Sequence, residues 1–189
     1  MKTITTLTQE AIALLKALIA TPSFSSEEAQ TALLIEQWFQ QNNIPFEREN
    51  NNIWAYNQHF DTTKPTFLLN SHHDTVKPNQ GYTNDPFEPI ERDGKLFGLG
   101  SNDAGGCLVA LLATFVHFYA QENLPYNLVM VASAEEGPIM RSFFSSDSTF
   151  SRASLGIPAD LIFFSISSNS EPSSSSPSSF WMALTCSFR

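Results

Sequence analysis

The residues in this sequence that are best suited to chemistry are two histidines and an aspartate at the end of an apolar run. The run at residues 67–70 leads through Ser71 into His72, His73 and Asp74. Side chains alternate along an extended strand, so His72 and Asp74 share one face and His73 lies on the other. A histidine and an aspartate two apart on one face are typical of a metal ligand and the carboxylate that orients it. A surface histidine pair in a loop is the alternative, because short motifs recur by chance.

Further acidic residues occupy comparable positions. Asp103 lies in the glycine-rich segment 98–106, just before a helix predicted over residues 107–119. Glu135 and Glu136 follow a second apolar, β-prone run at residues 127–132. Asp103 as a helix cap and the glutamates as a solvated charge pair are the structural alternatives. Two strands and a buried helix that all end in metal-capable side chains instead favour one shared site for metal-assisted hydrolysis.

The elements around these residues predict an α/β fold. Helical spacing of apolar residues predicts helices at about residues 6–21 and 25–42, each opened by a capping-box pattern. Strands are expected at residues 53–56, 67–70 and 127–132, with a hairpin around Asp93 and Gly94. Helices that alternate with strands indicate a mostly parallel sheet flanked by helices on both faces.

Bulk composition excludes several classes of protein. The chain has 189 residues, 42% of them hydrophobic, and a formal net charge of -9, so nucleic acid is excluded as a partner because phosphate binding needs a basic surface. The two cysteines, Cys107 and Cys186, are far apart and predict neither a disulfide framework nor a thiolate zinc site. No signal peptide or membrane span is recognisable, and a cytoplasmic location is expected.

The composition changes after residue 136. Residues 137–189 contain 17 serines in 53 positions, whereas residues 1–136 contain 6. Serine-rich stretches punctuated by proline are typical of disordered linkers. We therefore expect a partial catalytic domain over residues 1–136 and an irregular tail over residues 137–189. The coincidence of the serine enrichment with the end of the α/β pattern suggests an out-of-frame or otherwise aberrant continuation.

Three segments carry a resemblance to a known family. Residues 71–76 (SHHDTV), 98–106 (GLGSNDAGG) and 134–136 (AEE) resemble the signatures of the family of acetylornithine deacetylase, succinyl-diaminopimelate desuccinylase and carboxypeptidase G. The chain most resembles the acetylornithine deacetylase branch, which acts in arginine biosynthesis. The resemblance implies a zinc-exopeptidase-like catalytic domain that holds two zinc ions, with cobalt or manganese as alternatives.

The resemblance also implies a role for each matched residue. His72 would bind one zinc with Asp74 holding its imidazole, Asp103 would bridge both metals, and Glu136 would bind the other zinc. Glu135 would be the general base that takes a proton from the attacking water. The implied substrate is a small N-acyl amino acid such as acetylornithine.

The match to the family pattern stops after Glu136. The resemblance implies a further carboxylate ligand and a late histidine, but no histidine follows His117, and Glu171 lies in a low-complexity stretch. Family members are often homodimers, and the dimerisation domain has no counterpart here. An inactive fragment, a dinuclear aminopeptidase or carboxypeptidase, and a serine-rich interaction protein therefore stay open as alternatives to a deacetylase.

Overall fold

The computed structural model describes residues 2–134 and 183–185. In chain order the elements are α1 (Ile4–Ile19), α2 (Ala29–Gln41), β1 (Glu47–Glu49), β2 (Asn52–Tyr56), β3 (Thr66–His72), β4 (Ile90–Arg92), β5 (Lys95–Phe97), the π-helical turn η1 (Ser101–Gly105), α3 (Gly106–Phe118), β6 (Asn127–Ser133) and β7 (Ala183–Thr185).

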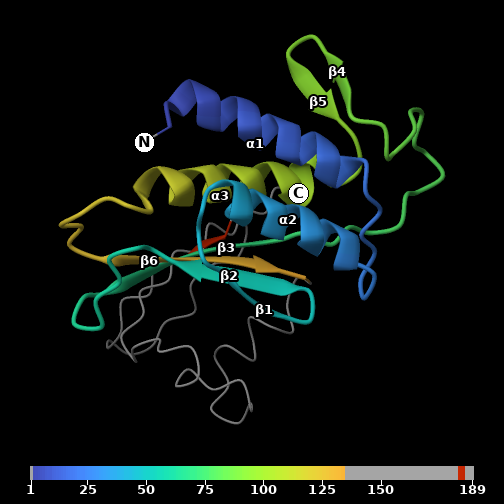
Figure 1. The fold of residues 1–189 in the computed structure, drawn as a ribbon. Helices are drawn as coiled ribbons and strands as arrows, with labels where there is room; N and C mark the ends of the chain where they lie inside the picture. Colours follow the sequence, from blue (N-terminus) through green and yellow to red (C-terminus); the bar gives the residue numbers. More distant parts are fainter. Residues whose placement is uncertain (1, 135–182, 186–189) are drawn as a thin grey trace, which may run out of the picture.

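A mixed five-stranded sheet carries the site-bearing strands. Its strand order is β1-β2-β6-β3-β7. Strand β3 pairs in parallel with β6 and β7, whereas β2 pairs antiparallel with both β1 and β6. The connection from β3 through α3 to β6 is long enough for the crossover that parallel neighbours require. The predicted α/β fold is confirmed, but the described sheet is mixed rather than mostly parallel, and its described helices do not lie on both faces as expected (Figure 1). The three helices described lie on the same face of this sheet (Figure 1).

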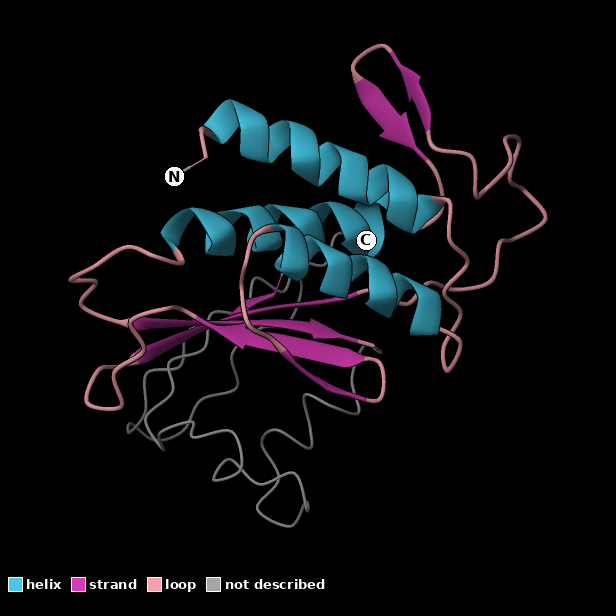
Figure 2. Ribbon diagram, viewed as in Figure 1, coloured by secondary structure: helices cyan, strands magenta, loops and turns pink. Residues whose placement is uncertain are grey.

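The hydrophobic core lies between this sheet and the helices (Figure 2). Alternate residues of β6 enter it, because successive side chains of a strand point to opposite faces. The helices contribute large side chains that are fully buried. The most buried members include Phe39, Phe115, Ile35, Ile53, Leu108, Leu112 and Met130. This packing holds β3 and β6 against the helices and so fixes the positions at which both strands end.

The two long N-terminal helices begin at positions that differ slightly from the sequence prediction. Helix α1 starts at Ile4, where Thr3 accepts a hydrogen bond from the backbone N–H of Thr6 at 3.1 Å. Helix α2 starts at Ala29 and has no side-chain cap. The carboxylate of Glu28, which precedes it, accepts hydrogen bonds from the backbone N–H of Ser26 and from Asn51.

No helix in the described part of the chain is both long and apolar enough to cross a membrane.

Two strands were absent from the sequence prediction. All three residues of β1 are exposed, so the segment lacks the apolar alternation that marks a half-buried strand. Strand β7 lies in the tail that was predicted to be irregular, yet it pairs in parallel with β3 over Leu68–Asn70. The predicted hairpin around Asp93 and Gly94 is present, and both residues have positive φ as a two-residue hairpin turn requires.

Candidate metal centre

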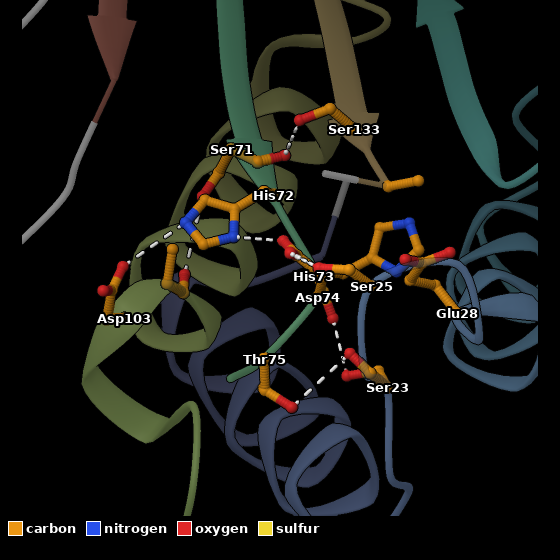
Figure 3. Close-up of polar contacts among 12 residues, drawn as sticks. Ser23, Ser25, Glu28, Ser71, His72, His73, Asp74, Thr75, Asp103 and Ser133 are labelled. Atoms are coloured by element: carbon orange, nitrogen blue, oxygen red, sulfur yellow. Dashed lines mark hydrogen bonds and ion pairs between the residues drawn. The ribbon is translucent and has the colours of Figure 1, made fainter. Parts of the chain in front are cut away.

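The end of β3 brings His72, Asp74 and Asp103 together, as Figure 3 shows. His72 Nδ1 lies 2.8 Å from Asp74 Oδ1, and His72 Nε2 lies 3.3 Å from Asp103 Oδ1. The side chains of His72 and Asp74 are each 13% exposed, and that of Asp103 is 50% exposed. A histidine held by one carboxylate therefore presents its second nitrogen to another carboxylate at an open edge.

Asp74 is held in a defined orientation by two donors. One carboxylate oxygen pairs with His72, and the other accepts a hydrogen bond from the hydroxyl of Ser25 at 3.1 Å. Burial by itself would raise the pKa of the Asp74 carboxyl, but the hydrogen bond and charge of His72, helped by Ser25, outweigh it and hold that pKa below its ordinary value. Asp74 is thus an ionised acceptor that fixes the imidazole of His72.

The protonation of His72 follows from these contacts. An ionised carboxylate can only accept, so Nδ1 of His72 carries the proton that it donates to Asp74. When the ring is neutral, Nε2 carries a lone pair that faces the Asp103 carboxylate. Two lone-pair donors that face each other fit a shared cation, and the carboxylate-bound histidine is the arrangement that metal-ligating histidines commonly adopt.

Asp103 lies in η1, where its backbone departs from helical geometry (φ -123°, ψ 97°). The N-cap of α3 is Gly105, and no side chain caps that helix. The structure therefore excludes the helix-cap interpretation of Asp103. The glycines after Asp103 let two backbone segments pack closely, as expected. A Cβ on Gly105 would lie 2.7 Å from the carbonyl oxygen of Gly100, so only glycine fits there without a shift.

The remaining predicted site residues, Glu135, Glu136 and Glu171, lie outside the described residues. Strand β6 ends at Ser133, which is in register with His72 on the adjacent parallel strand. The described chain thus leaves β6 at the edge of the sheet where His72 stands. Within residues 2–134 and 183–185, no group of three or more His, Cys, Asp and Glu side chains is arranged to hold a metal ion. His72 and Asp103 are thus the two predicted metal ligands that the described residues bring together.

The other histidines lie apart from this pair. His73 points away from it into the core, where it is 5% exposed, as the strand alternation predicts. His59 is exposed in a turn. The half-buried ring of His117 packs edge-on against Phe118 with centroids 4.8 Å apart.

Sequence reasoning missed the contribution of the loop between α1 and α2. Ser25 was interpreted as part of a capping box, but its hydroxyl bonds to Asp74, 49 residues away. Ser23 Oγ likewise donates to the carbonyl of His73 at 2.8 Å. No local pattern marks these contacts, because they join segments that meet only after the chain has folded.

Curated relatives share this N-terminal region. The chain is 34% identical over 139 residues to succinyl-diaminopimelate desuccinylase of Coxiella burnetii, which covers 68% of this chain and 36% of the relative. It is 31% identical over 143 residues to the desuccinylase of Methylibium petroleiphilum, covering 69% and 37% respectively. The matched part thus spans about a third of the length of these relatives.

Solved structures show the same fold. An M20 family metallo-carboxypeptidase from Sulfolobus solfataricus has a TM-score of 0.57 at 19% identity and is matched over 71% of this chain and 32% of its own. The dipeptidase Dug1p of Saccharomyces cerevisiae has a TM-score of 0.56 at 21% identity, with 75% and 35% covered.

The family match includes most of β3 and all of η1 and α3, the elements around the candidate metal centre. It runs over residues 68–175, which is more than half of the chain and includes His72, Asp74 and Asp103. It continues past residue 136, where the composition changes, and the domain boundary placed there stays a prediction. This chain belongs to the peptidase family M20/M25/M40.

Proposed function

We propose that this chain is the metal-binding N-terminal part of an amidohydrolase that removes an acyl group from an N-acyl amino acid. The observation that carries the proposal is the convergence of His72 and Asp103 on one point, with His72 fixed by Asp74. Membership of the M20/M25/M40 family supports the metal-dependent hydrolase class.

Five residues have proposed roles. His72, Asp103 and Glu136 hold two divalent ions, for which zinc is proposed and cobalt or manganese are the alternatives. Asp74 positions His72, and Glu135 is the general base that takes a proton from the attacking water and delivers it to the leaving amine. The metal ions supply Lewis acidity, which polarises the scissile carbonyl and lowers the pKa of water. Glu135 and Glu136 follow β6 in the sequence, and β6 ends at Ser133 in register with His72. This register supports the roles proposed for both glutamates.

The acyl group is proposed from the curated relatives. Both desuccinylases remove a succinyl group from diaminopimelate, according to their names, and are 31–34% identical to this chain. N-Succinyl-diaminopimelate is therefore a candidate beside the acetylornithine implied by the sequence signatures. Both are small amides of a diamino acid, and a cytoplasmic location is part of the proposal.

Metal binding tests the first part of the proposal. Zinc, cobalt(II) and manganese(II) are titrated into the purified full chain after treatment with EDTA, and His72→Ala serves as the comparison. We expect zinc to bind and the His72→Ala variant to bind at least about tenfold more weakly, because a direct ligand is removed. The absence of zinc binding, or equal binding by both proteins, would overturn the metal centre.

Hydrolysis tests the second part. N-Succinyl-diaminopimelate, N-acetylornithine and an unmodified dipeptide are offered at equal concentration to the zinc-loaded chain, and the released amine is quantified. Cleavage of an acyl substrate in preference to the dipeptide is the expected order. Preference for the dipeptide would replace the deacylase with a peptidase. Tight zinc binding with no turnover would identify a metal-binding but inactive fragment.

A further inference from the structure

We propose that His73 is a positioning residue of the metal centre. It anchors the end of β3 so that His72 faces Asp103 while Asp74 pairs with His72. The inference rests on the proposed function, since it concerns the same metal site. It assigns a task to a buried histidine that takes no direct part in binding the metal or in the hydrolysis.

All four polar groups of His73 are engaged. Its backbone N–H donates to the carbonyl of Ser133 at 3.0 Å, and its own carbonyl accepts from Ser23 Oγ at 2.8 Å. On the ring, Nδ1 lies 2.9 Å from Thr31 Oγ1 and Nε2 lies 2.9 Å from the carbonyl oxygen of Asn51. Both peptide units that flank this residue are thereby fixed.

The ring contacts define the state of the imidazole. A carbonyl can only accept, so Nε2 of His73 carries a proton and donates it to Asn51. Nδ1 lies within hydrogen-bond distance of Thr31 Oγ1, and the Thr31 hydroxyl also bonds to the carbonyl oxygen of Glu28. The ring of His73 thus links α2 to the turn between β1 and β2.

The partners of His73 come from four separate parts of the fold. Ser23 belongs to the loop before α2, Thr31 to α2, Asn51 to the turn between β1 and β2, and Ser133 to β6. Asn51 is itself held by Glu28, whose buried carboxylate accepts from Asn51 Nδ2 at 2.9 Å. The strand end is consequently tied to the helical layer and to the sheet at the same time.

This anchoring determines where the ligands point. His72 and Asp74 flank His73 and project to the opposite face, so a rotation or shift of the His73 peptide units would move the His72 ring away from Asp103 and disturb its pairing with Asp74. An apolar residue at position 73 would fill the space but leave the Thr31 hydroxyl and the Asn51 carbonyl without this partner. The hydrogen-bonding pattern, and not burial alone, therefore accounts for a histidine here.

The test compares four variants of the full chain with wild type. His73→Leu removes both ring contacts, Thr31→Val removes one of them from the helix side, and His73→Gln retains an N–H donor for Asn51. His59→Gln, in an exposed turn, is the matched histidine control. The measurements are the zinc dissociation constant by chelator competition, the visible spectrum of the cobalt(II) form, and the thermal midpoint in EDTA.

We expect zinc to bind about tenfold more weakly to His73→Leu and by a smaller factor to Thr31→Val, with an altered cobalt spectrum in both. His73→Gln should recover part of the affinity, and His59→Gln should match wild type. If His73→Leu fails to fold, Thr31→Val and His73→Gln decide the question.

Two results would overturn the inference. One is a wild-type dissociation constant and cobalt spectrum in Thr31→Val and in His73→Leu, or in His73→Gln if His73→Leu does not fold, with His72→Ala impaired; this result would leave the proposed metal centre standing. The other is a wild-type chain that binds no zinc, which would remove the proposed function together with the positioning role.

Discussion

The carboxylate of Asp74 offers the sharpest test of how this centre is built. Asp74 accepts from His72 Nδ1 at 2.8 Å and from the Ser25 hydroxyl at 3.1 Å. Asp74→Asn keeps an acceptor oxygen for His72 but removes the negative charge, whereas Asp74→Ala removes the acceptor as well. The pair of variants therefore separates the contribution of the charge from that of the hydrogen bond.

The magnitudes follow from the two kinds of hydrogen bond. A bond to a charged partner contributes about 1.5–3 kcal/mol and a neutral one about 1 kcal/mol, so the charge accounts for about 0.5–2 kcal/mol. At about 1.4 kcal/mol per factor of ten, Asp74→Asn should weaken zinc binding by about twofold to thirtyfold. Asp74→Ala should weaken it by about tenfold to a hundredfold, as expected for the loss of the carboxylate behind a metal-ligating histidine.

Isothermal titration with zinc, or competition with a chromophoric chelator at low affinity, measures these ratios on the full chain. Asp93→Asn is the matched control, since asparagine also tolerates the positive φ of 54° in the β4–β5 turn and the residue is exposed. Zinc affinities within twofold of wild type for both Asp74 variants, together with a clear loss in His72→Ala, would refute the orienting role of this carboxylate.

Three further predictions concern the scaffold. Asn127→Leu should lower the free energy of unfolding by about 2–4 kcal/mol in urea, because the fully buried Asn127 amide bonds to both the N–H and the carbonyl of Asp61 at 2.8 Å; a loss below about 0.5 kcal/mol would contradict this. Gly105→Ala should cost about 1–3 kcal/mol, since its Cβ would lie 2.7 Å from the Gly100 carbonyl oxygen, and an unchanged thermal midpoint would disprove the close approach. Burial, followed by the charge of Glu47, raises the pKa of Tyr56 to about 12 from 10.0, so its phenol should ionise late in an absorbance titration at alkaline pH. The folded state holds that proton more tightly, so the stabilising contribution is complete below pH 10 and is lost as the pH rises toward 12, an effect that Tyr56→Phe should abolish.

The site-bearing strands were predictable because their signals are local. The apolar run that ends in His72 and the run at residues 127–132 became β3 and β6, which are adjacent and parallel. Alternation along β3 was sufficient to place His72 and Asp74 on one face and His73 on the other. The hairpin turn at Asp93 and Gly94 was predictable for a similar reason, since few residues adopt positive φ without strain.

Other elements left no such signal. Strand β1 is exposed throughout, and β7 is a three-residue strand in a serine-rich segment, so neither shows the alternation by which strands are recognised. Asp103 illustrates a different limit, because an aspartate before a helix is far more often a cap. Only the coordinates show that Gly105 occupies the cap position and that Asp103 lies beside His72 instead.

The sequence by itself determined the residue types of the centre, the strand that carries His72 and Asp74, and membership of a hydrolase family. The tertiary structure decided which distant groups hold that strand end, namely Ser25 on Asp74, and Thr31 and Asn51 on His73. The physical reason is that periodicity and turn chemistry act over a few neighbouring residues, whereas these hydrogen bonds join groups 22 to 49 positions apart. Such pairs acquire a defined distance only when the core has packed.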